Sequence, residues 1–537
     1  MTRITSFSIT GTTKSFRDYT IGFIGFFAFF LGNLNGATII VHPGDDIQAA
    51  IDGASCGDTI QILAGTYVQE FEINSINLNI VGAGIGSTII QSPSSTGLIN
   101  TFTYAADGTV YRPIIMVENS TVNIQNITVD GNNQGDIGSA PRFAGIGYHN
   151  SGGTVSNVYV TNIQDSSYPI GYQEGYGILA VGDSGTNAIT IENCTVDNFQ
   201  KSGILTIGAN LTFNVEGNTV TGNTPASPAN ANGIELYDGA TGVVQNNTVT
   251  NLIGSSAASC ALLAFDAVNL TITNNTISAS DEGIYCFDCG DNLTISANTS
   301  SDNNDAGITI YNSDTSGVVS SNIIGNTVTD NVNAGIYLYS AVNDTVSLAN
   351  NNFVNGEAGL IVEGSGITGP VVTMDGDSFT GTAGYYIQEI AAPNDIWPST
   401  SNVSFDGLIS GSITHAQFEE ILAKIYDAHN DMSLGLVLDF IPLATPIAPA
   451  NFVGMVRADS FLQPTGFILE AKWEASTSPF ITHYVIYFQG NEVARISADA
   501  PLVYVTDLAI RSDAKHYKIA AVNADHQKSE HLKITIE

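Results

Sequence analysis

Residues 326–338 read Asn326-Thr327-Val328-Thr329-Asp330-Asn331-Val332-Asn333-Ala334-Gly335-Ile336-Tyr337-Leu338. Two phrases in this stretch, Asn-Thr-Val and a Gly-Ile followed by alternating apolar residues, recur along the chain. The second phrase or its equivalent begins, at spacings of 30, 28, 22, 24, 28 and 24 residues, at Gly203, Gly233, Ala261, Gly283, Gly307, Gly335 and Gly359. Self-similarity with this period predicts a solenoid in which each repeat forms one coil.

Each predicted coil contains short runs rich in Val, Ile and Thr, such as 270–273, separated by Asn, Gly and Asp. Such alternation is typical of strands with one buried side. A repeat of 22 to 30 residues is too short for a strand with a crossover helix, so we expect parallel sheets of coils stacked about 4.8 Å apart. The sequence therefore predicts an all-β chain with a right-handed parallel β-helix over residues 37–414. The repeated asparagines are predicted to form a structural ladder, with a backbone that tolerates the left-handed region.

Both ends of the predicted solenoid carry a helical pattern that would cover an open sheet edge. Residues 45–51 place two aspartates before a short amphipathic helix. Residues 415–429 place Phe418, Ile421, Leu422, Ile425 and Tyr426 at helical spacing. We predict that residues 415–450 form a capping helix and a Pro-rich linker, which contains Pro442, Pro446 and Pro449.

Residues 451–537 differ in composition from the solenoid and are predicted to form a small β-sandwich. Trp473 and the later Tyr517-Lys518-Ile519-Ala520-Ala521-Val522 resemble the core tryptophan and the tyrosine corner of fibronectin-type-III domains. An unrelated small sandwich remains the alternative. In either case the sequence indicates a spacer or an adhesion module, since it shows no catalytic pattern there.

The charge is strongly acidic and unevenly distributed. The chain has 15 Lys and Arg against 51 Asp and Glu, a formal net charge of −36, and residues 37–414 contain 35 acidic residues but only Arg112, Arg142 and Lys201 as basic ones. A field of this sign repels nucleic acid and anionic lipid. We therefore expect no nucleic-acid partner.

The N-terminus has the pattern of a signal peptide. Arg3, Lys14 and Arg17 precede an apolar run over 21–31 that is short for a membrane span. We expect residues 1–36 to be removed and the protein to be secreted or displayed on the cell surface, with membrane attachment only if this segment is retained as an anchor. Of the five cysteines, Cys286 and Cys289 have the spacing of half a zinc site, but they lack a second half and favour buried or locally paired thiols.

The entry segment resembles a known group. Val41-His42-Pro43-Gly44-Asp45-Asp46-Ile47, followed by Gly57-Asp58-Thr59-Ile60 and Ala64-Gly65-Thr66-Tyr67, is similar to the start of pectin-lyase-like right-handed β-helix proteins, and the later coils resemble their parallel β-helix repeats. The resemblance covers about residues 37–412. It implies the fold, but not one function, because that superfamily includes lyases, hydrolases, epimerases, tailspikes and non-catalytic surface proteins.

Two segments are similar to alginate epimerases, Val129-Asp130-Gly131-Asn132 and Gly175-Tyr176-Gly177. In those enzymes the second segment runs into an Asp-Pro-His-Glu motif, whereas Ile178-Leu179-Ala180-Val181 follows here. Epimerase activity is therefore not predicted.

The irregular early coils hold the candidate site residues, because loops that interrupt a solenoid are where it usually binds ligands. Arg142, Glu174 and Lys201 lie two or three residues before Gly-Ile anchors and are predicted to share one corner of consecutive coils. For a uronan lyase, Arg142, Lys201 or His149 would be the catalytic base, and Asp130, Asp136, Asp197 or Glu174 would hold a Ca²⁺ ion. Scattered loop charges are the competing interpretation. Tyr168, Tyr172 and Tyr176, together with Glu174, are the predicted substrate-binding residues, while Tyr285 and Tyr337 favour ladder packing.

The sequence leaves three functions open. We favour a secreted or cell-surface protein that binds a polysaccharide, a cell-surface glycan or extracellular matrix without catalysis. The alternatives are a Ca²⁺-dependent polysaccharide lyase acting on a uronan, and a purely structural stalk without a ligand.

Overall fold

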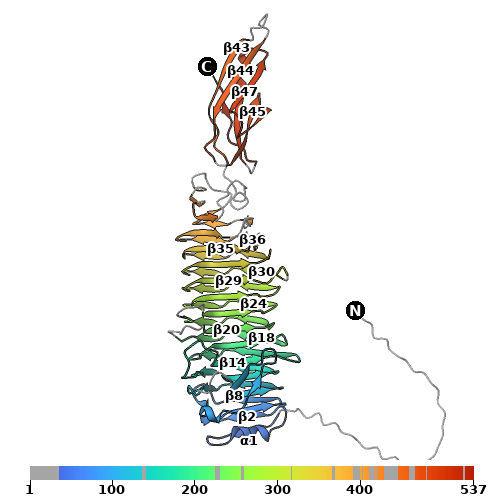
Figure 1. Cartoon of the computed structure of the whole chain (residues 1–537), viewed down its shortest axis with the longest axis vertical. Helices are drawn as coiled ribbons and strands as arrows, with labels where there is room; N and C mark the ends of the chain where they lie inside the picture. Colours follow the sequence, from blue (N-terminus) through green and yellow to red (C-terminus); the bar gives the residue numbers. More distant parts are fainter. Residues whose placement is uncertain are drawn as a thin grey trace, which may run out of the picture.

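A computed structural model describes residues 36–135, 141–223, 230–254, 259–315, 317–365, 369–390, 399–401, 403–409, 417, 420–421, 423–427, 445–458, 466–478, 480–523 and 526–537. Most of these residues form a column of stacked coils built from three parallel sheets of 14 strands each (Figure 1). One coil contributes one strand to each sheet, which confirms the predicted right-handed parallel β-helix. In the described residues, no helix has the length and apolar character that crossing a membrane requires.

The first sheet contains β1 (Thr38–Val41), β2 (Thr59–Ile62), β5 (Leu78–Val81), β9 (Thr121–Gln125), β12 (Gly152–Ser156), β15 (Asn187–Glu192), β18 (Leu211–Glu216), β21 (Thr241–Gln245), β24 (Leu270–Thr273), β27 (Leu293–Ser296), β30 (Ser320–Ile324), β33 (Thr345–Ala349), β36 (Val371–Asp375) and β39 (Ser399–Ser401). The second contains β3 (Gly65–Val68), β6 (Thr88–Gln91), β10 (Thr128–Asp130), β13 (Tyr159–Thr161), β16 (Thr195–Val196), β19 (Thr219–Thr221), β22 (Thr248–Thr250), β25 (Thr276–Ser278), β28 (Thr299–Ser301), β31 (Thr327–Thr329), β34 (Asn352–Val354), β37 (Ser378–Thr380), β40 (Ser404–Phe405) and β41 (Leu408–Ile409).

The third sheet carries the predicted Gly-Ile anchors. It contains β4 (Phe71–Asn74), β8 (Val110–Glu118), β11 (Arg142–His149), β14 (Tyr176–Val181), β17 (Ser202–Ile207), β20 (Asn232–Tyr237), β23 (Cys260–Phe265), β26 (Glu282–Phe287), β29 (Ala306–Asn312), β32 (Ala334–Ser340), β35 (Ala358–Gly364), β38 (Tyr385–Glu389) and β42 (Ile425–Asp427), and β7 (Phe102–Thr103) pairs with β8. The isoleucines of the anchors point into the core. The glycine before each of them also faces the core, since a Cβ at Gly335 would meet Phe353 and Val328.

The predicted asparagine ladder is present. Its members are at most 2% exposed, and each side-chain amide donates to the Oδ1 of the next at 2.9–3.0 Å, through Asn218, Asn247, Asn275, Asn298, Asn326 and Asn351 to Asp377. The backbone prediction was wrong by one residue. The positive φ belongs to the residue before each ladder position, for example Asn246 at 58° and Asn274 at 56°. The ladder residue itself directly precedes the next strand and does not have a positive φ.

The N-terminal cap is confirmed as α1 (Ile47–Asp52), whose N-cap Asp46 accepts from the backbone N–H groups of Gln48 and Ala49. At the other end the predicted helix is wrong beyond Lys424. Ile425 and Tyr426 belong to β42, which pairs with β38 and so continues the third sheet. Ile421 is helical and 1% exposed, whereas Phe418 and Leu422 lie outside the described residues.

The C-terminal part forms two four-stranded sheets around its own core. One contains β43 (Ala450–Ala458), β44 (Phe467–Glu474), β47 (Val503–Leu508) and β50 (Thr535–Ile536), and the other β45 (Ile481–Phe488), β46 (Asn491–Ser497), β48 (Tyr517–Asn523) and β49 (Leu532–Lys533), with a short 3₁₀ helix at Arg511–His516. Trp473 is 5% exposed and lies 5.6 Å from Tyr484, centroid to centroid. This confirms a sandwich-like unit, while its fibronectin-type-III identity stays a prediction.

Candidate functional site

A depression of about 250 Å³ lies on the outer face of the third sheet, across the coils that contain β8, β11, β14, β17 and β20. We call it the outer pocket. Its lining consists of Asp107, Tyr111, Arg142, Gln173, Tyr176, Leu205, Ile207, Glu235 and Tyr237. Tyr111, Tyr176, Leu205 and Ile207 are buried, so they form the floor, and the remaining polar side chains form the walls.

Residues 102–110, here called the strap, fold back over this sheet and supply one wall. Phe102 and Tyr104 are at most 4% exposed and pack on an outer apolar cluster that includes Met116 and Leu179. The Tyr104 hydroxyl donates to Asp238, and the Ala105 backbone N–H donates to Asp183 Oδ1 at 3.1 Å. The strap therefore reaches from β8 to the coil of β20 and places Asp107 at the outer pocket.

Among the described residues that line the outer pocket, Arg142 is the only cationic one. Its Nη1 donates to the Tyr176 hydroxyl at 3.2 Å, and its Cζ lies 5.9 Å from the centroid of the Tyr111 ring. The Tyr176 hydroxyl donates in turn to Gln173 Oε1 at 2.7 Å. Burial raises the pKa of both tyrosines, so they stay protonated at neutral pH. Within the part of the chain that the structure describes, no carboxylate forms an ion pair with this guanidinium.

The opposite wall is acidic. Glu235 accepts from the Asn232 side-chain amide at 3.1 Å and from the Ser202 hydroxyl, which fixes its carboxylate on the outer face. Asp107 is exposed at the strap. The outer pocket thus combines one fixed cation, two carboxylates and three tyrosine hydroxyls over an apolar floor.

The structure brings Glu174 close to Arg142, but Glu174 is buried and does not line the outer pocket. Glu174 is 2% exposed, and its Oε2 has no hydrogen-bond partner. Burial raises its pKa to about 7, with a further rise from Asp165 and an opposing effect from Arg142. Because it does not line the outer pocket, Glu174 supports the wall rather than touching a ligand there.

Lys201 does not share the position of Arg142 and Glu174. Ala144 pairs with Tyr176 and Tyr176 with Ser202; Arg142 and Glu174 lie two residues before their paired residues, whereas Lys201 lies one residue before Ser202. A shift of one residue turns a side chain to the other side of a strand. Lys201 Nζ donates to the Asn230 carbonyl at 2.8 Å, away from the outer pocket lining. The predicted corner of three charges therefore holds only two.

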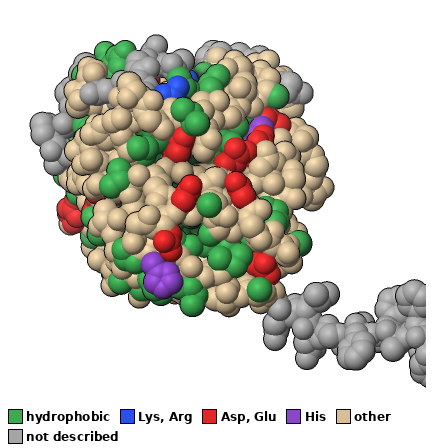
Figure 2. All heavy atoms as spheres, turned by 90° about the horizontal axis from the view of Figure 1, so that it is seen from below, with side chains coloured by type: hydrophobic (Ala, Val, Ile, Leu, Met, Phe, Trp, Pro, Cys, Tyr) green, Lys and Arg blue, Asp and Glu red, His purple; other side chains and the backbone are tan. Residues whose placement is uncertain are grey.

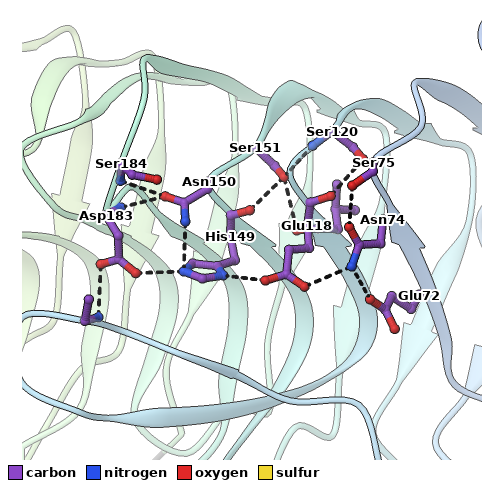
Figure 3. A network of polar contacts seen from close by, with 12 residues as sticks. Glu72, Asn74, Ser75, Glu118, Ser120, His149, Asn150, Ser151, Asp183 and Ser184 are labelled. Atoms are coloured by element: carbon purple, nitrogen blue, oxygen red, sulfur yellow. Dashed lines mark hydrogen bonds and ion pairs between the residues drawn. The ribbon is translucent and has the colours of Figure 1, made fainter.

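His149 lies at the other end of β11, about 20 Å along the strand from Arg142. Its ring stacks on Phe102 of the strap at 4.7 Å between centroids. Nε2 is 2.7 Å from Asp183 Oδ2 and Nδ1 is 3.1 Å from Glu118 Oε1, so the ring lies between two carboxylates (Figure 3). Because Asp183 also holds the strap, His149 belongs to the strap's anchor.

Two of the aspartates predicted to bind a cation, Asp130 and Asp197, lie on the second sheet or just beyond it. Asp130 accepts from the side-chain amides of Gln91 and Asn162 at 2.9 Å, and Asp197 accepts from the hydroxyls of Tyr159 and Thr161. Asp136 lies outside the described residues. Among those described, no three His, Cys, Asp or Glu side chains are grouped so that they could hold a metal ion. A Ca²⁺ site stays a prediction.

The loop between β13 and β14 carries the predicted ligand tyrosines. Tyr168 and Tyr172 pack with ring centroids 5.6 Å apart, and Tyr172 is 43% exposed. Gln200 anchors this loop from below, since its Nε2 donates to the carbonyls of Tyr168 at 2.7 Å and Pro169 at 3.0 Å. Tyr168 is half-buried, and although Tyr172 directly precedes Gln173 in the sequence, neither tyrosine lines the outer pocket.

Aromatic side chains continue along the outer face above the outer pocket. We call them the aromatic ladder, which consists, with neighbouring centroids 4.2–5.4 Å apart, of Tyr237, Phe265, Phe287, Tyr311 and Tyr339. From Phe265 onward the neighbouring rings are within 12° of parallel, so their faces cover one another. Tyr285 and Tyr337 are half-buried, as predicted, but they do not stack in the aromatic ladder, since Tyr285 meets Phe287 edge-on and Tyr337 donates to Glu363.

Sequence reasoning found Arg142 and Tyr176 but did not include the other seven lining residues among its candidate site residues. Glu235 and Tyr237 follow Gly233 by two and four residues, so strand alternation could have placed them on the outer face. Gln173 adjoins two predicted residues. Asp107 and Tyr111 give no such signal, because only the folding of the strap brings them to the outer pocket.

Comparisons with known proteins agree with the architecture. A family described as "Right handed beta helix region" matches residues 144–323 and 245–401. The class of the chain is thus a right-handed parallel β-helix with a small sandwich-like unit. A search of curated proteins finds no match.

Solved structures with a similar chain path include carbohydrate-active enzymes. The A-module of the mannuronan C-5 epimerase AlgE6 of Azotobacter vinelandii is 15% identical, with 67% of this chain and 94% of that chain covered and a TM-score of 0.37. The catalytic domain of a GH87 alpha-1,3-glucanase is 16% identical over 70% and 65%, with a TM-score of 0.41. The periplasmic alginate epimerase AlgG is 13% identical over 68% and 83%, with a TM-score of 0.43. At these values none of them assigns an activity to this chain.

Proposed function

We propose that this protein binds a polysaccharide at the outer pocket and catalyses no reaction on it, as a secreted or cell-surface protein. The observation that carries the proposal is Arg142, a half-buried guanidinium held by Tyr111 and Tyr176 in a depression whose other wall is acidic. A few fixed polar groups over an apolar and aromatic floor are typical of sites that bind small or extended ligands. A depression near the lower end of the usual range, about 300 Å³, fits one or two sugar units of a longer chain.

The surroundings of the candidate catalytic groups support binding without catalysis. A base must reach the proton that it abstracts, directly or through one water. His149 lies between two carboxylates under Phe102, and Lys201 is bonded to a carbonyl. The high pKa of Tyr176 disfavours loss of its proton.

Affinity electrophoresis with a panel of neutral, acidic and amino-bearing polysaccharides tests the proposal. We expect retardation by at least one polymer, and about a tenfold weaker interaction in Arg142→Ala. Arg457→Ala, which changes an exposed arginine of β43, is the control. Thermal unfolding of both variants checks that the fold persists, and Tyr237→Ala at the opposite rim is a second variant that leaves the Arg142 packing intact. If no polymer is retained, the protein is a structural stalk.

A uronan lyase is the competing function, and one observation favours it. Arg142 could offset the charge of a uronate while it contacts the Tyr176 hydroxyl, a group able to transfer a proton. Incubation with pectin and alginate, followed by absorbance of unsaturated uronate, distinguishes the two. Product formed by the wild type and lost in Tyr176→Phe would overturn binding without catalysis.

A further inference from the structure

The charges around the outer pocket point to the kind of polymer that it accepts. In the part of the chain that the structure describes, Arg142 is its only cationic lining residue, whereas Asp107 and Glu235 both line it. Asp183 and Asp238 hold the strap on the adjacent surface. Further along the aromatic ladder, Asp266 and Asp288 follow Phe265 and Phe287, and burial together with the neighbouring aspartates raises the pKa of Asp266. The field of the region is therefore negative in spite of Arg142.

The broader surface shows the same sign. Residues 37–414 have 35 acidic and 3 basic side chains. In the space-filling view from the α1 end, acidic side chains are visible in many places and basic ones in few (Figure 2). A polyanion would meet this field along its whole length, and Arg142 supplies the outer pocket with a single compensating charge.

The hydrogen-bonding groups of the walls also distinguish uncharged from charged ligands. A carboxylate only accepts hydrogen bonds, a guanidinium only donates them, and an amide or a tyrosine hydroxyl does both. Asp107 and Glu235 thus require donors from the ligand, while Arg142 requires an acceptor. A sugar hydroxyl satisfies either kind of partner, whereas a uronate carboxylate satisfies only the donors and an ammonium group only the acceptors.

An aromatic ring stands at the rim. Tyr237 is half-buried, lines the outer pocket and forms the end of the aromatic ladder, where it is tilted by 37° against Phe265. Unlike the rings above it, it does not lie parallel to its neighbour in the aromatic ladder. The apolar C–H face of a hexose can pack against such a ring.

We infer that the polymer bound at the outer pocket is an uncharged polysaccharide of hexose units, with hydroxyl groups bridging Arg142 to Glu235 and Asp107. This inference rests on the proposed function, because it specifies the ligand of the same site. An amino-bearing polymer is attracted by the surrounding carboxylates but repelled by Arg142. A uronan is attracted by Arg142 but repelled by the surrounding carboxylates, which outnumber that one cation.

Affinity electrophoresis at low and high salt separates the possibilities, with soluble neutral α- and β-glucans, alginate and chitosan as probes at a pH where chitosan is soluble. We expect at least one neutral glucan to bind about tenfold more tightly than alginate or chitosan. Its affinity should change little with salt, since screening affects charged polymers most. Glu235→Gln should weaken glucan binding and reduce the discrimination against alginate, because it removes a strong acceptor and a negative charge together.

The failures are distinguishable. Retention of alginate or chitosan in preference to every neutral polymer would overturn this inference and leave polysaccharide binding in place. Absence of retention by all probes would overturn the proposed function itself, and the inference with it. Unchanged discrimination in both Glu235→Gln and Asp107→Asn would show that these carboxylates do not select the ligand.

Discussion

The coils from β8 to β20 and those from β23 to β38 have the same three-sheet cross-section. They differ in the hydrogen-bond and stacking partners of their side chains. In the later coils each asparagine of the ladder bonds to the next coil, and each ring of the aromatic ladder stacks on the next. In the coils of β8, β11 and β14, the ladder position is occupied instead by Ile127, Val158 and Cys194. There the outer face is covered by inserted segments, the strap and the loop between β13 and β14.

This difference indicates where a solenoid can acquire a binding site. A regular coil satisfies its neighbours completely, so few polar groups remain for a ligand. The inserted segments approach the sheet from outside and leave a depression where they do not meet, and Arg142 and Glu235 face that depression. Interruption of the repeat is therefore the structural origin of the outer pocket.

The largest effect is expected for Asn275→Ala, which breaks the regular region. Asn275 donates to the carbonyl of Val244 and to Asn298, and its Oδ1 accepts from the backbone and side chain of Asn247. Loss of the side chain leaves several buried groups unpaired, so we expect the free energy of unfolding to fall by about 4 kcal/mol. Urea titration measures it.

The matched control is Asn123→Ala, which removes an exposed asparagine that bonds to Asn79 at 2.9 Å on the first sheet. It should cost less than about 1 kcal/mol. Equal losses in the two variants would show that burial does not distinguish the ladder from the surface asparagines.

The end of the ladder gives the second prediction. Asp377 is 0% exposed, its Oδ1 accepts from Asn351, and its Oδ2 has no partner. Burial raises its pKa to about 6 from 3.8. The folded state therefore favours the protonated acid, and stability should fall as the pH rises from about 4 to about 6 and then level off.

Asp377→Asn should abolish this dependence, since an amide can donate to the Leu348 carbonyl as the register of the ladder implies. The pKa of Asp377 in the folded state exceeds its ordinary value by about two units, which corresponds to about 3 kcal/mol. Above pH 6 the variant should be more stable than the wild type by about this amount. Urea titrations of both proteins at pH 4 and pH 8 measure it. A variant no more stable than wild type at pH 8 would contradict the expected cost of the buried carboxylate.

The regular coils could be predicted from the sequence because their information is local and repeated. Gly335 and Ile336 set the phase of one strand, and the same phase returns in every coil. The C-terminal cap failed because residues 425–427 have an apolar pattern compatible with both helix and strand, and pairing with β38 decided between them.

The outer pocket could be predicted only in part. Arg142 and Tyr176 adjoin Gly-Ile anchors, so the repeat places them. Lys201 lies two residues before Gly203, whereas Arg142 lies three before Gly145, so the spacing in the sequence already separates the two. Asp107 depends on the strap, whose position follows from contacts with residues as distant in sequence as Asp238. Such contacts leave no periodic trace in the sequence.

The smallest effect is expected at a glycine beneath the strap, within the irregular coils. Gly147 pairs with Leu179, and Leu179 with Leu205, so a single column of the third sheet changes from glycine to leucine. A Cβ at Gly147 would lie 2.9 Å from Pro113 Cγ and 3.0 Å from Phe102 Cε1. Glycine at this position therefore lets the strap lie close to the sheet.

Gly147→Ala should lift the strap and displace Asp107, weakening binding of a retained polysaccharide by about tenfold, or about 1.4 kcal/mol. Affinity electrophoresis measures binding, and faster hydrogen exchange of the Ala105 amide would report the loosened strap. Gly317→Ala is the control, since a Cβ there meets nothing within 4 Å. If Gly147→Ala binds as wild type while the Ala105 amide exchanges faster, the strap is not part of the binding site, and the irregular coils bind their ligand through Arg142 and its tyrosines alone.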